Sequence, residues 1–189
     1  SEGPKVLDEF NKQGFDLFLD LKLHDIPNTV YKALKNLLNQ DVWMTNIHLL
    51  GGEEMIQAAR EAKEHSKSKA FLIGVTVLTS LDDNNIKNMG FNLKISELVK
   101  ILSLSAKKYH IDGVVCSAQE VPEIKGNIGI DFITVTPGIR IEQNKSDQSR
   151  VTTLEEATEN GSDFIVLGRE ITASKDISKM IKKIESYII

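Results

Sequence analysis

Short apolar runs alternate with stretches of helical spacing along most of the chain. The apolar runs predict six strands, over residues 16–20, 42–47, 70–77, 113–116, 132–135 and 164–167. Apolar residues spaced three or four apart predict helices over residues 5–12, 28–39, 52–64, 95–109, 154–159 and 176–187, with a brief one near Glu120. Asn28 is placed to cap the second helix, and Thr153 forms a capping box with Glu156.

The order of these elements is one helix followed by six strand–helix units. Strands that are apolar throughout and alternate with helices are typical of a parallel sheet buried on both faces. The sequence therefore predicts an α/β fold, in a single domain over residues 1–189. Six units fit an open doubly wound sheet, and they fit most of an eight-stranded barrel equally well.

Composition and charge argue against several classes of protein, including nucleic-acid-binding and membrane proteins. The chain has 189 residues, 41% of them hydrophobic, and a formal net charge of −4. A chain this balanced is not expected to bind nucleic acid through its overall field. Its single cysteine, Cys116, excludes an internal disulfide and fits a reducing compartment. No apolar stretch approaches the roughly 18 residues of a membrane span. We therefore expect a cytoplasmic protein that binds neither nucleic acid nor membrane.

The segment from Phe18 to Thr29 carries the most chemistry. In both α/β architectures, ligand-binding groups gather just after the C-terminal ends of the strands. Asp20 and Lys22 are two residues apart and point to the same face of an extended chain, and Asp25 follows closely. Ionisable groups at the mouth of a buried sheet are costly unless they are paired. A structural ion pair would explain Asp20 and Lys22 alone, but two acids and a base within six residues favour a reactive cluster.

Polar residues also follow the last two predicted strands. Thr136 to Arg140 contains Pro137 and Gly138, which shape a fixed turn. Gly168 and Arg169 close the sixth strand, where a glycine lets backbone N–H groups approach an anion and an arginine supplies a forked charge. Because the loops after the last two strands of barrels often bind phosphate, we predict a phosphate site here rather than a plain turn. The polar stretch 142–150 is either a mobile lid or a surface connection.

Other candidate groups point to no further chemistry. We interpret His48, at the end of the second strand, as an ordinary structural histidine, and Cys116 as an inert core residue. The sequence has no Walker loop and no GxGxxG motif, so it does not indicate a nucleotide cofactor. No pair of histidines has metal-ligand spacing, and we predict no metal and no cofactor.

The residues from Asp20 to Thr29, in the pattern Asp-x-Lys-x-x-Asp-Ile-Pro-x-Thr, resemble the signature of the orotidine 5'-phosphate decarboxylase family. Thr-Pro-Gly-Ile-Arg at 136–140, Asp-Gln at 147–148 and Gly-Arg at 168–169 appear in the order of the bacterial members, as do segments 77–80 and 112–117. The resemblance spans nearly the whole chain. It implies a TIM (β/α)8 barrel, with strands three to eight in this chain, and a homodimer.

The resemblance also implies an activity, the cofactor-free decarboxylation of orotidine 5'-monophosphate to UMP, which is the last step of de novo pyrimidine synthesis. Asp20 would face the substrate carboxylate, Lys22 would protonate C6, and Asp25 would reach into the neighbouring subunit's site. The remaining implied contacts are Ile26 and Thr29 beside Asp25, Thr79 and Ser117 at the ribose and pyrimidine, and Pro137, Arg140, Gln148, Gly168 and Arg169 around the phosphate.

The chain also departs from the family pattern. A TIM barrel takes about 250 residues and eight strands, against six predicted strands here. The family's earlier strands carry a further Asp and Lys with no counterpart in this sequence, so we expect the domain to be incomplete at its N-terminus. Two alternatives therefore stay open: a metal-using sugar-phosphate decarboxylase or aldolase of the same superfamily, and a non-catalytic phosphate-binding remnant.

Overall fold

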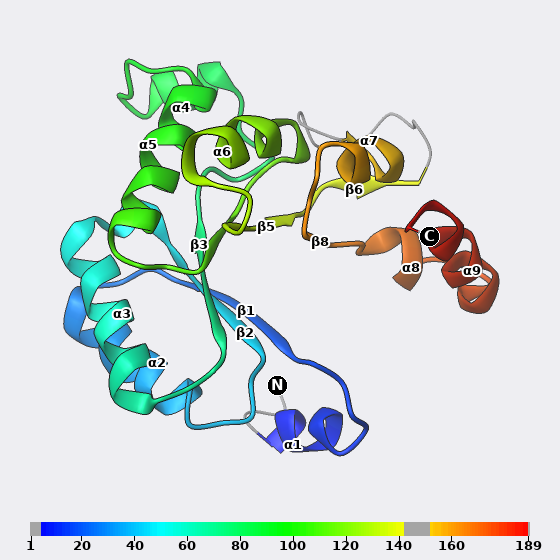
Figure 1. Ribbon diagram of the computed structural model, residues 1–189, viewed down its shortest axis with the longest axis horizontal. Coiled ribbons are helices and arrows are strands. Elements are labelled where there is room, and N and C mark those ends of the chain that lie inside the picture. Colours follow the sequence, from blue (N-terminus) through cyan, green and yellow to red (C-terminus); the bar gives the residue numbers. More distant parts are fainter. Residues whose placement is uncertain (1–4, 142–151, 189) are drawn as a thin grey trace. The chain divides into compact units, whose positions relative to one another are not determined.

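The computed structural model describes residues 5–141 and 152–188, traced in Figure 1. The chain forms two compact units, one of residues 1–76 and 102–114, the other of residues 77–101 and 115–189. Each unit is described by itself. Within the described residues, no helix is long and apolar enough to cross a membrane.

The first unit is built from three strands and the helices that follow them. Its elements in chain order are α1 (Lys5–Asn11), β1 (Phe18–Leu23), α2 (Pro27–Leu37), β2 (Met44–His48), the 3-10 helix η1 (Leu49–Gly51), α3 (Glu53–Ser66) and β3 (Phe71–Val75). The C-terminal part of α5 (Ile95–Lys108) and most of β4 (Gly113–Val115) also belong to it. β2 pairs in parallel with β1 on one side and with β3 on the other, and α2 packs against α3 (Figure 1).

The second unit holds the remaining elements. In chain order they are α4 (Asp83–Asn88), the start of α5, η2 (Ala118–Glu120), α6 (Val121–Ile128), β5 (Ile133–Thr136), β6 (Ile139–Arg140), β7 (Thr152–Thr153), α7 (Leu154–Glu159), β8 (Phe164–Ile165), α8 (Arg169–Thr172) and α9 (Ile177–Ile188). β5 pairs in parallel with β8, and β6 pairs in parallel with β7 in a small separate sheet. The main sheet has the strand order β1-β2-β3-β4-β5-β8. Strands alternating with helices in this order agree with the predicted α/β fold.

Burial explains why β2 is so regular and β1 is not. β2 has a partner strand on each side, and its first four residues are fully buried. β1 ends the sheet order, and its central residues Asp20, Leu21 and Lys22 are exposed. The core of the first unit includes Leu34 of α2 and Ile47 of β2, both with no exposed surface. The alternation of strands and helices therefore buries the middle of the sheet and leaves Asp20 and Lys22 exposed at its edge.

The second unit has its own apolar cluster. Its buried members are Ala118, Ile139, Ile141, Leu154, Ala157 and Ile184. Leu154 opens α7, where Thr153 accepts a hydrogen bond from the Glu156 N–H and Glu156 accepts one from the Thr153 N–H. The predicted capping box is therefore confirmed, and it fixes the start of a helix whose apolar side joins the cluster.

Two aspartates connect strands through the same arrangement. Asp112, directly before β4, accepts hydrogen bonds from the Leu72 N–H of β3 at 2.7 Å and from the Lys63 ammonium. Asp163, directly before β8, accepts from the Thr134 N–H of β5 at 2.7 Å and from the Lys125 ammonium at 2.6 Å. Each carboxylate satisfies a donor at the start of a neighbouring strand, and each is neutralised by a lysine from the helix that precedes that neighbouring strand, α3 or α6.

Several predicted boundaries were wrong. The first strand covers residues 18–23 rather than 16–20, so Lys22 lies inside it. Asn28 does not cap the second helix, because Pro27 opens α2 and Ile26 takes the cap position without a side-chain hydrogen bond. No helix was predicted between the strand of residues 70–77 and the helix of residues 95–109, but α4 lies there and begins with a capping box between Asp82 and Asn85. The short β6–β7 pair and α8 were also missed, since elements of two to four residues leave no periodic signal.

Candidate active site

Asp20 and Lys22 of β1 form the ion pair that the sequence predicted. The Lys22 ammonium lies 2.6 Å from both carboxylate oxygens of Asp20. The Asp20 side chain is 45% exposed and the Lys22 side chain is 41% exposed, so the pair is open to solvent and to a ligand. Such an exposed ion pair contributes little to stability, about 0–1 kcal/mol, so its value to the fold is small.

The backbone beneath this pair is not regular strand. Lys22 has φ of +48°, in the left-handed region that side chains other than glycine rarely adopt. Leu19 pairs with Thr45 and Leu23 pairs with Ile47, so three residues of β1 lie opposite one residue of β2. Asp20 and Lys22 were predicted to lie together on the assumption of a regular extended strand. The contact is confirmed, but a bulge with a left-handed residue produces it.

Asn46 of β2 is the residue opposite the bulge, and it was not among the predicted site residues. Its side-chain oxygen accepts a hydrogen bond from the Lys22 N–H at 2.7 Å. Its side-chain nitrogen donates one to Oδ1 of Asp20, also at 2.7 Å. Asn46 has no exposed surface. A signal was present, since an asparagine in an otherwise apolar buried strand needs polar partners.

Two histidines lie beside the ion pair. The rings of His24 and His48 stack with their centroids 5.1 Å apart. Burial lowers the pKa of His48 below its usual value, and the nearby charges of His24 and Lys22 lower it further. Its Nδ1 faces the Leu50 N–H at 3.4 Å, as an acceptor would. The lowered pKa of His48 favours its neutral form beside the Asp20–Lys22 ion pair, consistent with the structural role predicted for it.

Gly51 provides the space for this arrangement. A Cβ at Gly51 would lie 3.3 Å from the His24 ring and 2.1 Å from Sδ of Met55, closer than van der Waals contact allows. The glycine therefore lets η1 approach both the histidine and α3.

The residues after the ion pair turn away into α2. Oδ1 of Asp25 accepts a hydrogen bond from the Ile26 N–H at 2.7 Å, and Asp25 is exposed. Ile26 is 66% exposed, which is unusual for a large apolar side chain. Thr29 is exposed in the first turn of α2. Among the described contacts, none joins Asp25 to Asp20 or Lys22, so the three charged groups predicted as a cluster separate into a pair and a single acid.

The second unit holds the residues predicted to contact the rest of a ligand. Thr79 and Ser117 are buried, and the Ser117 N–H donates to the Glu120 carboxylate at 2.8 Å where η2 begins. Pro137 is half-buried.

The predicted phosphate residues lie around the start of α8. Gly168 and Arg169 are exposed there, and the Gly168 carbonyl accepts from the Ile171 N–H at 3.0 Å. Arg140 of β6 forms an ion pair at 3.2 Å with Glu170, the residue that follows Arg169, and this pair connects β6 to α8. Gln148 lies outside the described residues.

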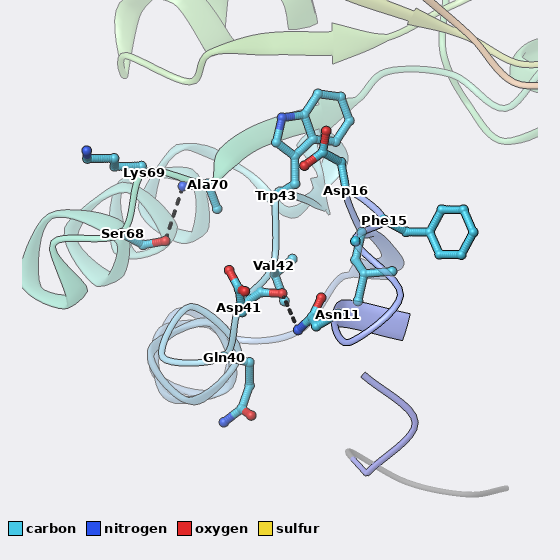
Figure 2. Close-up of a pocket in the computed structure, with 12 residues that line it drawn as sticks. Asn11, Phe15, Asp16, Gln40, Asp41, Val42, Trp43, Ser68, Lys69 and Ala70 are labelled. Carbon is cyan, nitrogen blue, oxygen red and sulfur yellow. Dashed lines mark hydrogen bonds between the residues drawn. The ribbon is translucent and has the colours of Figure 1, made fainter. Parts of the chain in front are cut away.

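A pocket of about 410 Å³ in the first unit lies elsewhere (Figure 2). Its walls come from the segments that precede β1, β2 and β3, and include Asp16, Asp41 and Trp43. In Figure 2 the Asn11 side chain donates to the Asp41 carbonyl, at 2.9 Å, and so joins α1 to the segment before β2. None of the predicted site residues lines this pocket, which is at the strand starts and not at their C-terminal ends.

The chain was compared with known proteins. Residues 1–184 match the model of the orotidine 5'-phosphate decarboxylase / HUMPS family. The chain belongs to this family. It is 47% identical over 183 residues to orotidine 5'-phosphate decarboxylase from Saccharophagus degradans, covering 96% of this chain and 77% of that protein. The corresponding enzyme from Carboxydothermus hydrogenoformans is 51% identical over 180 residues, covering 93% and 75%.

Solved structures support the same assignment. The crystal structure of orotidine 5'-phosphate decarboxylase from Lactobacillus acidophilus matches with a TM-score of 0.85 and 38% identity, over 98% of this chain and 81% of that one. The fold class is thereby confirmed as the TIM-barrel type, with six of its strand–helix units in this chain. The predicted membership in a family of carboxy-lyases is confirmed as well.

Proposed function

We propose that this chain converts orotidine 5'-monophosphate to UMP by direct loss of CO2, without a cofactor. The observation that carries the proposal is the Asp20–Lys22 ion pair. Its two opposite charges lie 2.6 Å apart and are exposed on β1, the strand that ends the sheet order. Relatives at 44–51% identity, from several bacteria, are all named orotidine 5'-phosphate decarboxylases, which favours this reaction over that of a sugar-phosphate enzyme.

The residue types suit the chemistry. Loss of CO2 from C6 of the pyrimidine leaves an electron pair on a vinyl carbon, with no adjacent carbonyl to delocalise it. An ammonium held at that carbon stabilises the developing charge and then gives up a proton, which completes UMP. Lys22 takes this role in the proposal, and Asp20 faces the substrate carboxylate while it holds the ammonium in place.

Other predicted site residues bind the remainder of the substrate in this proposal. Thr79 and Ser117 contact the ribose and pyrimidine region. The phosphate is bound by Gln148, Gly168 and Arg169, with Pro137 and Arg140 shaping the turn beside them. Binding energy from a phosphate distant from the reacting carbon can be used to organise the site in the transition state.

The phosphate assignment is tested by the Arg169→Ala variant. Removing a charge-assisted contact costs about 1.5–3 kcal/mol, so the dissociation constant for UMP should rise roughly ten- to hundredfold. Uridine, which has no phosphate, serves as the control ligand, and its affinity should not change. Equal losses for UMP and uridine would place the phosphate elsewhere.

We further propose a two-fold dimer in which Asp25, with Ile26 and Thr29 beside it, completes the partner's site. Asp25 is exposed and contacts neither Asp20 nor Lys22 among the described contacts, and the apolar Ile26 next to it is exposed. A two-fold interface is self-complementary, so both sites would form together.

Mixing two inactive variants tests the shared site. In a hybrid dimer of Lys22→Ala and Asp25→Ala chains, one of the two sites keeps both residues, so activity should return in part. Native mass spectrometry confirms that hybrid dimers form. If hybrids form and the mixture stays inactive, the shared-site proposal is wrong.

The reaction itself is tested by the loss of orotidylate absorbance on adding purified protein. We expect turnover of orotidine 5'-monophosphate that is unchanged by added magnesium or by EDTA. Activity that requires magnesium, or that appears only with sugar phosphates, would support the sugar-phosphate alternative. Binding of UMP without any turnover would support the non-catalytic alternative.

A further inference from the structure

Asn46 occupies an unusual position for a polar side chain. It is the third residue of β2, it has no exposed surface, and strands pair on both sides of it. Burying an amide without partners costs about 1–3 kcal/mol in proteins. An apolar residue would serve an ordinary buried strand better, so the partners of Asn46 explain its presence.

Both ends of the Asn46 amide are used, and each contacts a residue of the ion pair. Its oxygen accepts from the Lys22 N–H, and its nitrogen donates to Oδ1 of Asp20, each at 2.7 Å. The same Asp20 oxygen also receives the Lys22 ammonium at 2.6 Å. One buried amide therefore connects the backbone of Lys22 to the carboxylate that binds the Lys22 side chain.

The bulge makes these bonds necessary. Between the pairs Leu19–Thr45 and Leu23–Ile47, three residues of β1 lie opposite Asn46 alone. The Lys22 N–H cannot find a ladder partner at such a point, because a bulge interrupts the regular pattern. Asn46 replaces the missing backbone acceptor with its side chain. This stabilises the left-handed conformation of Lys22, whose φ is +48°.

We infer that Asn46 is a positioning residue, which sets the place of the Lys22 ammonium by holding the bulge and the Asp20 carboxylate together. This inference rests on the proposed function, since it assigns Asn46 to the decarboxylation site. Asn46 acts through Asp20 and Lys22 and is not itself the acid or the base. Its donor and its acceptor have separable effects, because aspartate keeps the acceptor and leucine keeps neither.

Kinetics of three variants test the inference. Asn46→Leu removes both hydrogen bonds and keeps the branched shape at Cγ, and Asn46→Asp keeps the acceptor for Lys22 but places a second carboxylate against Asp20. The control is Thr45→Val, which removes a buried hydrogen bond from β2 to the Leu19 carbonyl, at 3.0 Å, without touching the ion pair. We expect kcat to fall about 10²-fold in both Asn46 variants, since displacement by about 1 Å can cost that much, with KM within about threefold.

The control separates positioning from stability. Thr45→Val should lose stability in urea unfolding as the Asn46 variants do, yet keep the parent kcat. A near-parent kcat in Asn46→Leu, or an equal fall in kcat in Thr45→Val, would overturn the inference.

A second measurement does not depend on turnover. By NMR hydrogen exchange, the Lys22 amide should be protected in the parent and in Asn46→Asp, and unprotected in Asn46→Leu. If the parent does not decarboxylate orotidine 5'-monophosphate, the proposed function fails, and exchange at Lys22 still decides the positioning. Protection that survives in Asn46→Leu would contradict it.

Discussion

Replacing Lys22 by glycine and by alanine separates its side chain from its backbone. Both variants remove the ammonium and the ion pair with Asp20, so both should lose turnover. They differ only at the backbone, where φ of +48° suits glycine and strains alanine. The structure therefore predicts that the glycine variant is the more stable of two equally inactive proteins.

The size of this difference follows from two opposing effects. A left-handed conformation costs a residue with a Cβ about 1–2 kcal/mol. Glycine gives back about 0.4–1 kcal/mol, because its unfolded chain has more conformations to lose. The net expectation is a free energy of unfolding about 1 kcal/mol higher for Lys22→Gly than for Lys22→Ala.

Urea unfolding measures the difference, and two other lysines calibrate it. Lys67, after α3, has φ of +54°, and its glycine variant should also be the more stable. Lys32, exposed inside α2, should show the reverse, with alanine favoured by about 1 kcal/mol. Suppose that the Lys67 and Lys32 variants behave as expected, but Lys22→Ala is at least as stable as Lys22→Gly. The strained bulge is then absent in solution, and Asn46 cannot position Lys22 through it.

Three further predictions concern the surrounding structure. The lowered pKa of His48 means that the free energy of unfolding should decrease as pH falls below about 6.5, and His48→Phe should flatten that part of a pH series of urea unfolding curves. Burial raises the pKa of Asp163, but hydrogen bonds from Lys125 and Thr134 lower it below its usual value overall. The Asp163–Lys125 pair should therefore stabilise the fold fully above pH 3.8, and the free energy of unfolding should decrease as the pH falls further. Lys125→Met should cost about 1–3 kcal/mol at pH 7 in the same assay, and no change would contradict the pairing. A Cβ at Gly74 would lie 2.5 Å from a methyl carbon of Leu49, so Gly74→Ala should lower stability by about 1–3 kcal/mol, and unchanged thermal unfolding would refute the close packing.

The sequence predicted the repeated strand–helix units and the charged residues at the end of the first strand. Apolar runs predicted the main strands, and the spacing of Asp20 and Lys22 predicted that their side chains share a face, because both signals are local. The bulge at Lys22 was not predictable in this way, since it depends on which residue of another strand lies opposite.

The role of Asn46 was also not predictable from local sequence. An asparagine inside an apolar strand signals a buried polar contact, but its partners are more than 20 residues away in the chain. The position of Arg169 after the last predicted strand already indicated a phosphate site, whereas the family resemblance supplied the role of Gln148 and the place of Asp25 in a partner's site. No contact among the described residues tests these roles, so they remain predictions.

The central claim is that Lys22 delivers the proton in the decarboxylation of orotidine 5'-monophosphate. Turnover by the parent and by Lys22→Ala, together with UMP affinity by calorimetry, tests it most directly. We expect kcat to fall at least about 10³-fold, because general acid catalysis and charge stabilisation are both lost, while UMP affinity stays within about tenfold. A Lys22→Ala variant that binds UMP and turns over at near the parent rate would contradict the claim.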